Sequence, residues 1–150
     1  MILSIDPGTI QSAYVIWDNK EKKIKDKGII SNENMLKLIE NNEDIELVIE
    51  MVACYGMPVG KTTFETVLWI GRFVQLAKKS TLVYRKDIKM FFCNTTRAKD
   101  SNVRQVLIDK FGETGTKKTP GKLYGVSKDI WSALAIAVFF SETFLKKEKK

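Results

Sequence analysis

The chain has 150 residues, of which 44% are hydrophobic and 29% are charged, and it contains no histidine. A chain of this length and composition is expected to form one soluble domain with its own hydrophobic core. The absence of histidine excludes histidine-based acid–base catalysis, serine–histidine and cysteine–histidine nucleophiles, and nearly all zinc chemistry. Any catalysis is therefore expected to depend on carboxylates, lysines and hard metal ions.

The sequence gives no sign of secretion or membrane insertion. No signal peptide is visible, and the longest apolar run, residues 130–140, is too short to span a bilayer. We therefore expect a cytoplasmic protein without membrane contact. Its two cysteines, Cys54 and Cys93, are expected to be buried thiols rather than a disulfide. The lysine-rich tail from about residue 146 is expected to be disordered.

The net charge of +7 is unevenly distributed along the chain. Residues 1–50 carry 6 Lys and 10 acidic residues, whereas residues 51–128 carry 15 Lys and Arg and 5 acidic residues. A basic second half beside acidic residues is typical of a protein that holds a polyanion near a metal site. A solvated, lysine-rich surface would give the same counts, so charge alone leaves both interpretations open.

The first third of the chain is predicted to be mostly strands. A short apolar run ends in Asp6 and is followed at once by a Pro-Gly turn, which is typical of a buried strand that stops abruptly. Asp18 and Asn19 are turn residues and predict a hairpin. Strands are expected over residues 2–6, 13–17, 24–30 and 45–50, with a short helix after Ser31 or Asn32.

Helices dominate the remainder of the chain. Thr62 and Glu65 have the spacing of a capping box, so Glu65 is assigned to a helix start rather than to a metal site. The helix that follows is apolar on two faces, and we expect the sheet to cover one face and a partner subunit the other. Helices are predicted over residues 63–78, 86–92 and 128–145 and after Asp100 or Ser101, with a strand over residues 81–84 and a loop over residues 112–125.

Three acidic residues stand where a core element reaches the surface. Asp6 and Glu50 end predicted strands, and Asp129 begins the last predicted helix. Each has a structural explanation by itself, as a turn former, a strand-end acid or a helix-start acid. Two-metal phosphodiester hydrolysis, however, requires carboxylates from separate elements, and Mg²⁺ accepts all-oxygen ligands. The combination predicts that Asp6, Glu50 and Asp129 are catalytic, metal-binding residues.

Five segments of the chain form a recognisable series: Ile-Asp-Pro-Gly-Thr at residues 5–9, Val-Ile-Glu at 48–50, Tyr-Gly-Met-Pro-Val-Gly at 55–60, and residues 64–73 and 129–137. In this order they resemble the RuvC family of Holliday junction resolvases, in particular its smaller members from phages and prophages. The resemblance spans essentially the whole chain, 1–150. It implies a ribonuclease H-like α/β fold, a mixed five-stranded sheet with helices on both faces, and the order of the predicted elements indicates the same fold.

The resemblance also implies a homodimeric endonuclease that nicks four-way and other branched DNA with two Mg²⁺ ions per active site, or with Mn²⁺ in their place. Asp6, Glu50 and Asp129 match three acidic positions of the family. Ser132 falls on the fourth position, where RuvC has aspartate, and a hydroxyl is a weaker metal ligand than a carboxylate. Ser132 lies on the same helical face as Asp129 and so remains a weak candidate ligand.

Candidate nucleic-acid contacts are aromatic or basic. Tyr55 is the nearest match to an aromatic residue that RuvC places near the junction centre, where it would stack on a base; a buried or interfacial tyrosine is the alternative. The glycine-rich loop over residues 112–125 carries three lysines, which are expected to contact phosphates unless they are merely solvated. The candidates are Tyr55, Lys61, Arg97, Lys99, Arg104, Lys117, Lys118 and Lys122.

Two alternative functions remain open from the sequence. One is an RNA-processing nuclease on the same fold, because recognition of the 2′-hydroxyl depends on local geometry. The other is a junction-binding protein that Ser132 leaves catalytically weak. Actin-like ATPases also begin with a strand and an Asp-x-Gly turn, but their two-domain chains are far longer than 150 residues.

Overall fold

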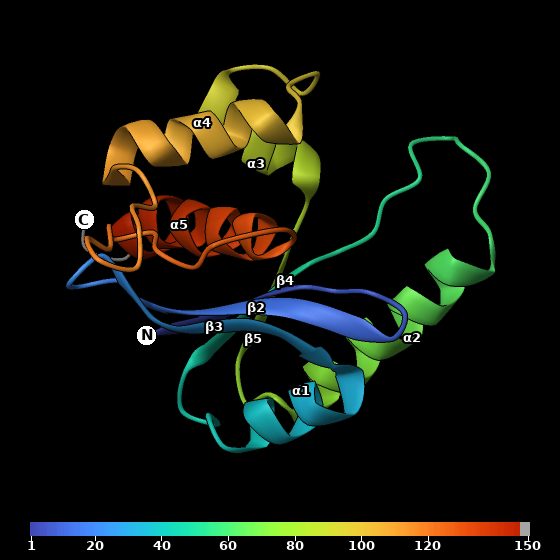
Figure 1. Cartoon of the computed structure of the whole chain (residues 1–150). Helices are drawn as coiled ribbons and strands as arrows, with labels where there is room; N and C mark the ends of the chain where they lie inside the picture. The colour runs from blue at the N-terminus through green and yellow to red at the C-terminus, as the bar shows by residue number, and fades with distance from the viewer. Residues whose placement is uncertain (148–150) are drawn as a thin grey trace.

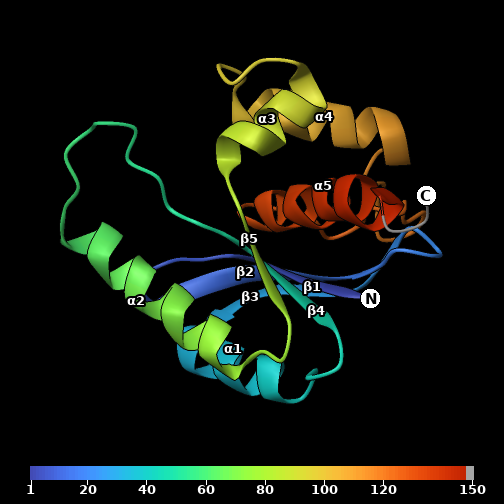
Figure 2. The same ribbon diagram turned by 180° about the vertical axis from the view of Figure 1, so that it is seen from behind.

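A computed structural model describes residues 1–147, which form a five-stranded sheet with helices on both faces (Figures 1 and 2). The elements are β1 (Ile2–Asp6), β2 (Gln11–Asp18), β3 (Lys23–Ser31), α1 (Asn32–Glu40), β4 (Glu46–Glu50), α2 (Lys61–Leu76), β5 (Ser80–Val83), α3 (Arg85–Cys93), α4 (Asp100–Phe111) and α5 (Ile130–Lys147). The strand order is β3-β2-β1-β4-β5. Strand β1 pairs antiparallel with β2 and parallel with β4, which confirms the predicted mixed sheet.

The central strand β1 is buried on both faces because its side chains alternate between two hydrophobic cores. Ile2 belongs to the core that α5 covers, whereas Leu3 and Ile5 belong to the core that α1 and α2 cover. Helix α5 lies directly on the sheet, and α3 and α4 pack on the outer side of α5 (Figure 1). The carboxyl end of β4 lies beside the starts of α3, α4 and α5, with the carboxyl end of β1 next to it.

The helix caps predicted from the sequence are confirmed at α1 and wrong at α2. Ser31 caps α1 as expected, and its side chain accepts a hydrogen bond from the backbone N–H of Asn34 at 3.2 Å. The capping box predicted for Thr62 and Glu65 is wrong, because α2 begins after Gly60 without a side-chain cap. Glu65 instead forms an ion pair with Lys61 one turn earlier, at 3.5 Å.

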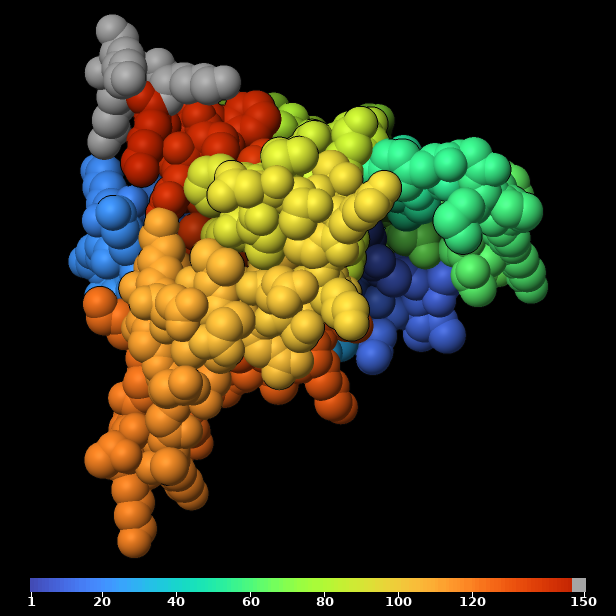
Figure 3. Space-filling model, turned by 90° about the horizontal axis from the view of Figure 1, so that it is seen from above, coloured from blue at the N-terminus to red at the C-terminus, as the bar shows by residue number. Residues whose placement is uncertain are grey.

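Two segments project from the body of the molecule, as Figure 3 shows. One is the β4–α2 connection, residues 51–60, which is exposed from residue 53 onward. It contains Cys54, so the expectation that this thiol is buried is wrong, whereas Cys93 is partly buried. The other is the loop over residues 112–125, closed by an isolated bridge between Gly115 and Pro120.

The C-terminal helix extends further than predicted. Helix α5 continues to Lys147, past residue 146 where the disordered tail was expected to begin, and residues 148–150 of that tail lie outside the described residues. None of the helices within residues 1–147 combines the length and the hydropathy that crossing a bilayer requires.

Candidate active site

Asp6 and Glu50 lie side by side at the ends of two neighbouring parallel strands. In the register of β1 and β4, Ile5 pairs with Ile49, so the next residues along both strands stand at the same edge of the sheet. Both side chains are mostly covered, and that of Glu50 is 14% exposed. The fold thus brings together the two carboxylates that the sequence placed at strand ends.

A buried polar network fixes the turn that follows Asp6. The Ser12 hydroxyl accepts a hydrogen bond from the Gly8 N–H at 3.1 Å and donates one to Asn32 Oδ1 at 2.6 Å. Asn32 Nδ2 in turn donates to the Gly8 carbonyl at 2.9 Å. A Cβ on Gly8 would meet the Gln11 carbonyl oxygen at 2.3 Å, so only glycine fits there. This closed network holds the backbone that presents the Asp6 carboxyl group.

Asp129 reaches the same end of the sheet from the start of α5. It is exposed, and its carbonyl accepts the N–H of Ala133 at 3.2 Å in the first turn. The buried Ser4 side chain of β1 donates a hydrogen bond to the Ala133 carbonyl at 2.7 Å, which anchors the beginning of α5 to the central strand. The position of Asp129 near Asp6 therefore follows from a direct contact between helix and strand.

The acidic side chains act on one another electrostatically. Burial, followed by the negative charge of Glu50, raises the pKa of Asp6 from 3.8 to about 7. Arg85 opposes this shift, whereas Asp129 and Asp100 add to it. Burial is the largest cause of this shift, and the neighbouring carboxylates add to it, so a cation bound beside Asp6 would favour its ionised form.

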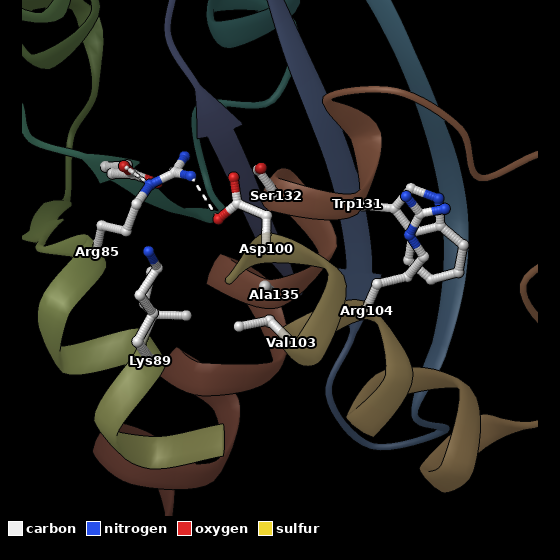
Figure 4. Close-up of a pocket in the computed structure, with 10 residues that line it drawn as sticks. Arg85, Lys89, Asp100, Val103, Arg104, Trp131, Ser132 and Ala135 are labelled. Atoms are coloured by element: carbon white, nitrogen blue, oxygen red, sulfur yellow. Dashed lines mark hydrogen bonds and ion pairs between the residues drawn. The ribbon is translucent and has the colours of Figure 1, made fainter. Parts of the chain in front are cut away.

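A guanidinium group bridges two of these carboxylates. Arg85 Nε donates to Glu50 Oε1 at 2.8 Å and Nη2 to Oε2 at 3.3 Å, while Nη1 donates to Asp100 Oδ1 at 2.8 Å (Figure 4). Burial lowers the pKa of Arg85, but the hydrogen bonds and charges of Glu50 and Asp100 outweigh it and raise that pKa above its ordinary value. Arg85 was not predicted from the sequence as a site residue, and Asp100 was predicted only as a helix cap.

Ser132 lines a pocket beside this ion pair. The pocket lies between the starts of α3, α4 and α5, and Glu50, Arg85 and Asp100 also line it (Figure 4). Ser132 thus lies at the same end of the sheet as Glu50, as predicted for a fourth ligand position, and the carboxylate of Asp100 lines the same pocket. Asp100 belongs to a different helix, so no local sequence pattern could have grouped it with Ser132.

The donor chemistry of this site fits a hard divalent cation, because the carboxylates of Asp6 and Glu50 end neighbouring strands and the charges of Glu50 and Asp129 act on Asp6. Among residues 1–147, however, no three Asp, Glu or Cys side chains are arranged around a single point as ion ligands. Glu50 and Asp100 are turned toward Arg85 instead. Side-chain movement would therefore have to accompany metal binding.

Three of the basic candidates lie near the acidic site. Arg104 lines the pocket and its guanidinium carbon stands 5.5 Å from the centre of the Trp131 ring. Lys99 immediately precedes Asp100 and caps α4, with Arg97 exposed in the same α3–α4 connection. Arg104 and Trp131 thus form a basic and aromatic rim beside the carboxylates, and Trp131 was not predicted from the sequence as a site residue.

Tyr55 and Lys61 lie on the projecting β4–α2 connection and the start of α2. Tyr55 is 61% exposed, so it is not buried within this chain, and an interfacial tyrosine stays the alternative to a DNA contact. Its backbone is left-handed, with a φ of 46°, and Lys86 Nζ stands 5.8 Å from its ring centre. The Lys61 side chain is 89% exposed.

The 112–125 loop, which carries three lysines, begins far from the acids and leads back to Asp129 at its other end. Asp100 begins α4 at the site, and Phe111 ends it about 17 Å away at about 1.5 Å per residue. The loop leaves that far end, opposite the start of α5 (Figure 1). Lys117, Lys118 and Lys122 are all exposed.

Comparisons with known proteins identify the fold. No protein-family model matches the chain, and a search of curated proteins gives no match. A Thermus thermophilus RuvC structure superposes with a TM-score of 0.66 over 95% of this chain and 96% of RuvC, at 14% identity. T. thermophilus RuvC in complex with Holliday junction substrate gives 0.69 over 98% and 95%, at 10% identity. The chain therefore has the ribonuclease H-like α/β fold of RuvC over nearly its whole length.

Proposed function

We propose that residues 1–150 act as one nuclease domain that cleaves Holliday junctions and other branched DNA. The observation that carries this proposal is the position of Asp6 and Glu50, at the ends of paired parallel strands, with Asp129 at the start of α5. The fold shared with RuvC, one structure of which contains a Holliday junction substrate, supports the same substrate class.

The reaction that fits these residues is metal-dependent phosphodiester hydrolysis. Asp6, Glu50 and Asp129 would hold two Mg²⁺ ions, or Mn²⁺ ions, with Ser132 as a weaker ligand. Bound divalent cations of this kind activate a water and stabilise the leaving oxygen. The chain itself orients the carboxylates, through the Ser12–Asn32–Gly8 network and the bond from Ser4 to α5.

Basic and aromatic side chains around the site would contact the DNA. Arg104 lines the pocket of the carboxylates and would bind phosphates near the cleaved bond, together with Arg97 and Lys99 from the connection before α4. Tyr55 and Lys61, on the projecting connection, would contact bases and backbone near the branch point. Lys117, Lys118 and Lys122 would bind a more distant part of a DNA arm.

The active form is proposed to be a homodimer that pairs through α2. The outer face of α2 carries Phe64 at 65% exposure and Leu68 at 66%, next to Val67 at 37%. Apolar side chains gathered on one helix face in this way favour a protein interface. A two-fold dimer would supply two active sites for two symmetric cuts.

A junction-binding protein with weak catalysis is the second candidate function. The observation in its favour is that Arg85 neutralises Glu50 while Ser132 stands in place of a carboxylate. Binding to junctions without cleavage in any divalent metal would support this candidate.

The proposed function is tested with a labelled four-way DNA junction and three variants. Asp6→Asn and Glu50→Gln should abolish metal-dependent nicking and leave junction binding largely intact. Glu46→Gln is the matched control, because Glu46 lies at the opposite end of β4 and accepts a hydrogen bond from Thr81. Normal turnover by Asp6→Asn would exclude the assigned site.

A further inference from the structure

Arg85 occupies a position that its own helix does not favour. It is the first residue of α3, where the positive end of the helix dipole repels a cation, and α3 has no side-chain cap at this end. The pairing of Glu50 with Val83 explains why it is nevertheless there. Arg85 follows Val83 by two residues, so the β4–β5 register brings its side chain to the Glu50 carboxylate.

The acids accept hydrogen bonds from three of the five N–H donors of the Arg85 guanidinium. Its Nε, Nη1 and Nη2 atoms all donate to carboxylate oxygens, and both oxygens of Glu50 accept. A divalent cation would need the same Glu50 lone pairs and would be repelled by a guanidinium beside it. The Arg85 side chain is 36% exposed, which leaves it a route to solvent through the pocket.

We propose that Arg85 is a built-in competitor of the catalytic metal: it neutralises Glu50 and Asp100 in the metal-free protein and must leave Glu50 for the metal to bind. This inference concerns the regulation of the proposed nuclease site and rests on that proposed function. Arg85 thereby neutralises the carboxylates of the metal-free site, and metal binding replaces the guanidinium with a divalent cation. Arg85 is assigned as a residue that controls metal occupancy.

The test measures Mn²⁺ binding to the whole protein, without DNA, by isothermal titration calorimetry. Arg85→Gln should lower the Mn²⁺ dissociation constant about tenfold or more, because the competing charge is removed. Arg104→Gln is the matched control, since it removes the same charge from the same pocket, where Arg104 contacts the Trp131 ring. The control should change the constant by less than about twofold.

Each result decides the question. A higher Mn²⁺ affinity in Arg85→Gln but not in Arg104→Gln supports the competition. An unchanged or lower Mn²⁺ affinity in Arg85→Gln, or an equal increase in both variants, overturns it. Absence of Mn²⁺ binding in every protein would overturn both the competition and the proposed metal chemistry. Wild-type binding that Arg85→Gln leaves unaltered would overturn the competition alone. If Arg85→Gln does not fold, Arg85→Lys replaces it, with smaller tightening expected because lysine lacks the two-pronged geometry of the guanidinium.

Discussion

The raised pKa of Asp6 makes the stability of the metal-free protein depend on pH. The folded protein retains a proton on Asp6 up to about pH 7, whereas the unfolded chain loses it near pH 3.8. Since the folded state binds more protons in that window, the free energy of unfolding should fall as pH rises from about 4 to about 7. The expected loss is on the order of 4 kcal/mol, at about 1.4 kcal/mol per pKa unit.

Urea denaturation in EDTA across that pH window measures this contribution. Asp6→Asn should flatten the decline and be more stable than the wild type near neutral pH, because the amide has no charge to bury. A wild-type curve with the same slope as that of Asp6→Asn would show that folding does not raise the pKa of Asp6.

Bound divalent metal should restore the stability that the folded protein loses when Asp6 ionises. Mg²⁺ or Mn²⁺ bound only by the folded protein raises its stability by mass action, by about 2.7 kcal/mol at 100 times the dissociation constant. The thermal midpoint at neutral pH should therefore rise with added metal in the wild type and much less in Asp6→Asn. An equal rise in both proteins would place the bound metal elsewhere.

Ser132 provides a third prediction at the residue scale. Ser132→Asp would add a carboxylate to the pocket that Glu50 and Asp100 already line, so it should alter the cleavage rate or the preference between Mg²⁺ and Mn²⁺. Cleavage rates in each metal measure the effect. Identical rates and preference in the variant and the wild type would show that this fourth position does not contribute.

The sequence could predict residues whose role follows from local position, and it missed those that depend on pairing across elements. Asp6 and Glu50 were recognisable because each ends an apolar run. Arg85 was not, because its contact with Glu50 depends on the register of β4 and β5. Ser12 and Asn32 were missed for the same reason, since β2 and α1 meet only in the folded chain.

At the scale of elements, apolar periodicity predicted the strands and helices, while helix starts were less predictable. The spacing of Thr62 and Glu65 suggested a capping box, but Lys61 is available one turn before Glu65 and pairs with it instead. Helix α4 begins at Asp100, one residue after Lys99, whose backbone N–H donates to the Asn102 side chain at 2.9 Å. Competing polar partners within one turn decide such starts.

The exposed face of α2 leads to a prediction about assembly. Phe64→Ser combined with Leu68→Ser should convert the proposed homodimer to a monomer, because both side chains are about two-thirds exposed on one helix face. Sedimentation equilibrium measures the outcome, with Met90→Ser as a control, since Met90 is 48% exposed on α3. A wild-type protein that is monomeric at high concentration, or a variant that still dimerises, would contradict the assignment of α2.

At the scale of the whole molecule, the projecting loop begins at the end of α4 that is far from Asp100, so its part in DNA binding can be measured apart from cleavage. Replacing Lys117, Lys118 and Lys122 together by alanine should reduce the slope of log affinity against log salt by about 2–3, at about 0.9 per phosphate contact. The cleavage rate at saturating protein should change little, because the loop lies at the far end of α4 (Figure 3). An unchanged salt slope would remove this loop from the DNA interface.

The fold of the whole molecule was predictable because the order of strands and helices is distinctive, and the superposition on RuvC confirms it. The same fold leaves the substrate to be decided by surface details such as the Arg104–Trp131 rim and the projecting connection. Substrate choice therefore has to be measured.

The most direct measurement compares cleavage of a labelled four-way DNA junction, a linear duplex of the same sequence and a matched RNA–DNA hybrid. Each is incubated with Mg²⁺, with Mn²⁺ and with EDTA. We expect paired nicks near the branch of the four-way junction that require metal and are lost in Asp6→Asn. Preferential cleavage of the hybrid, or tight junction binding without nicks in either metal, would contradict a junction-selective DNA nuclease.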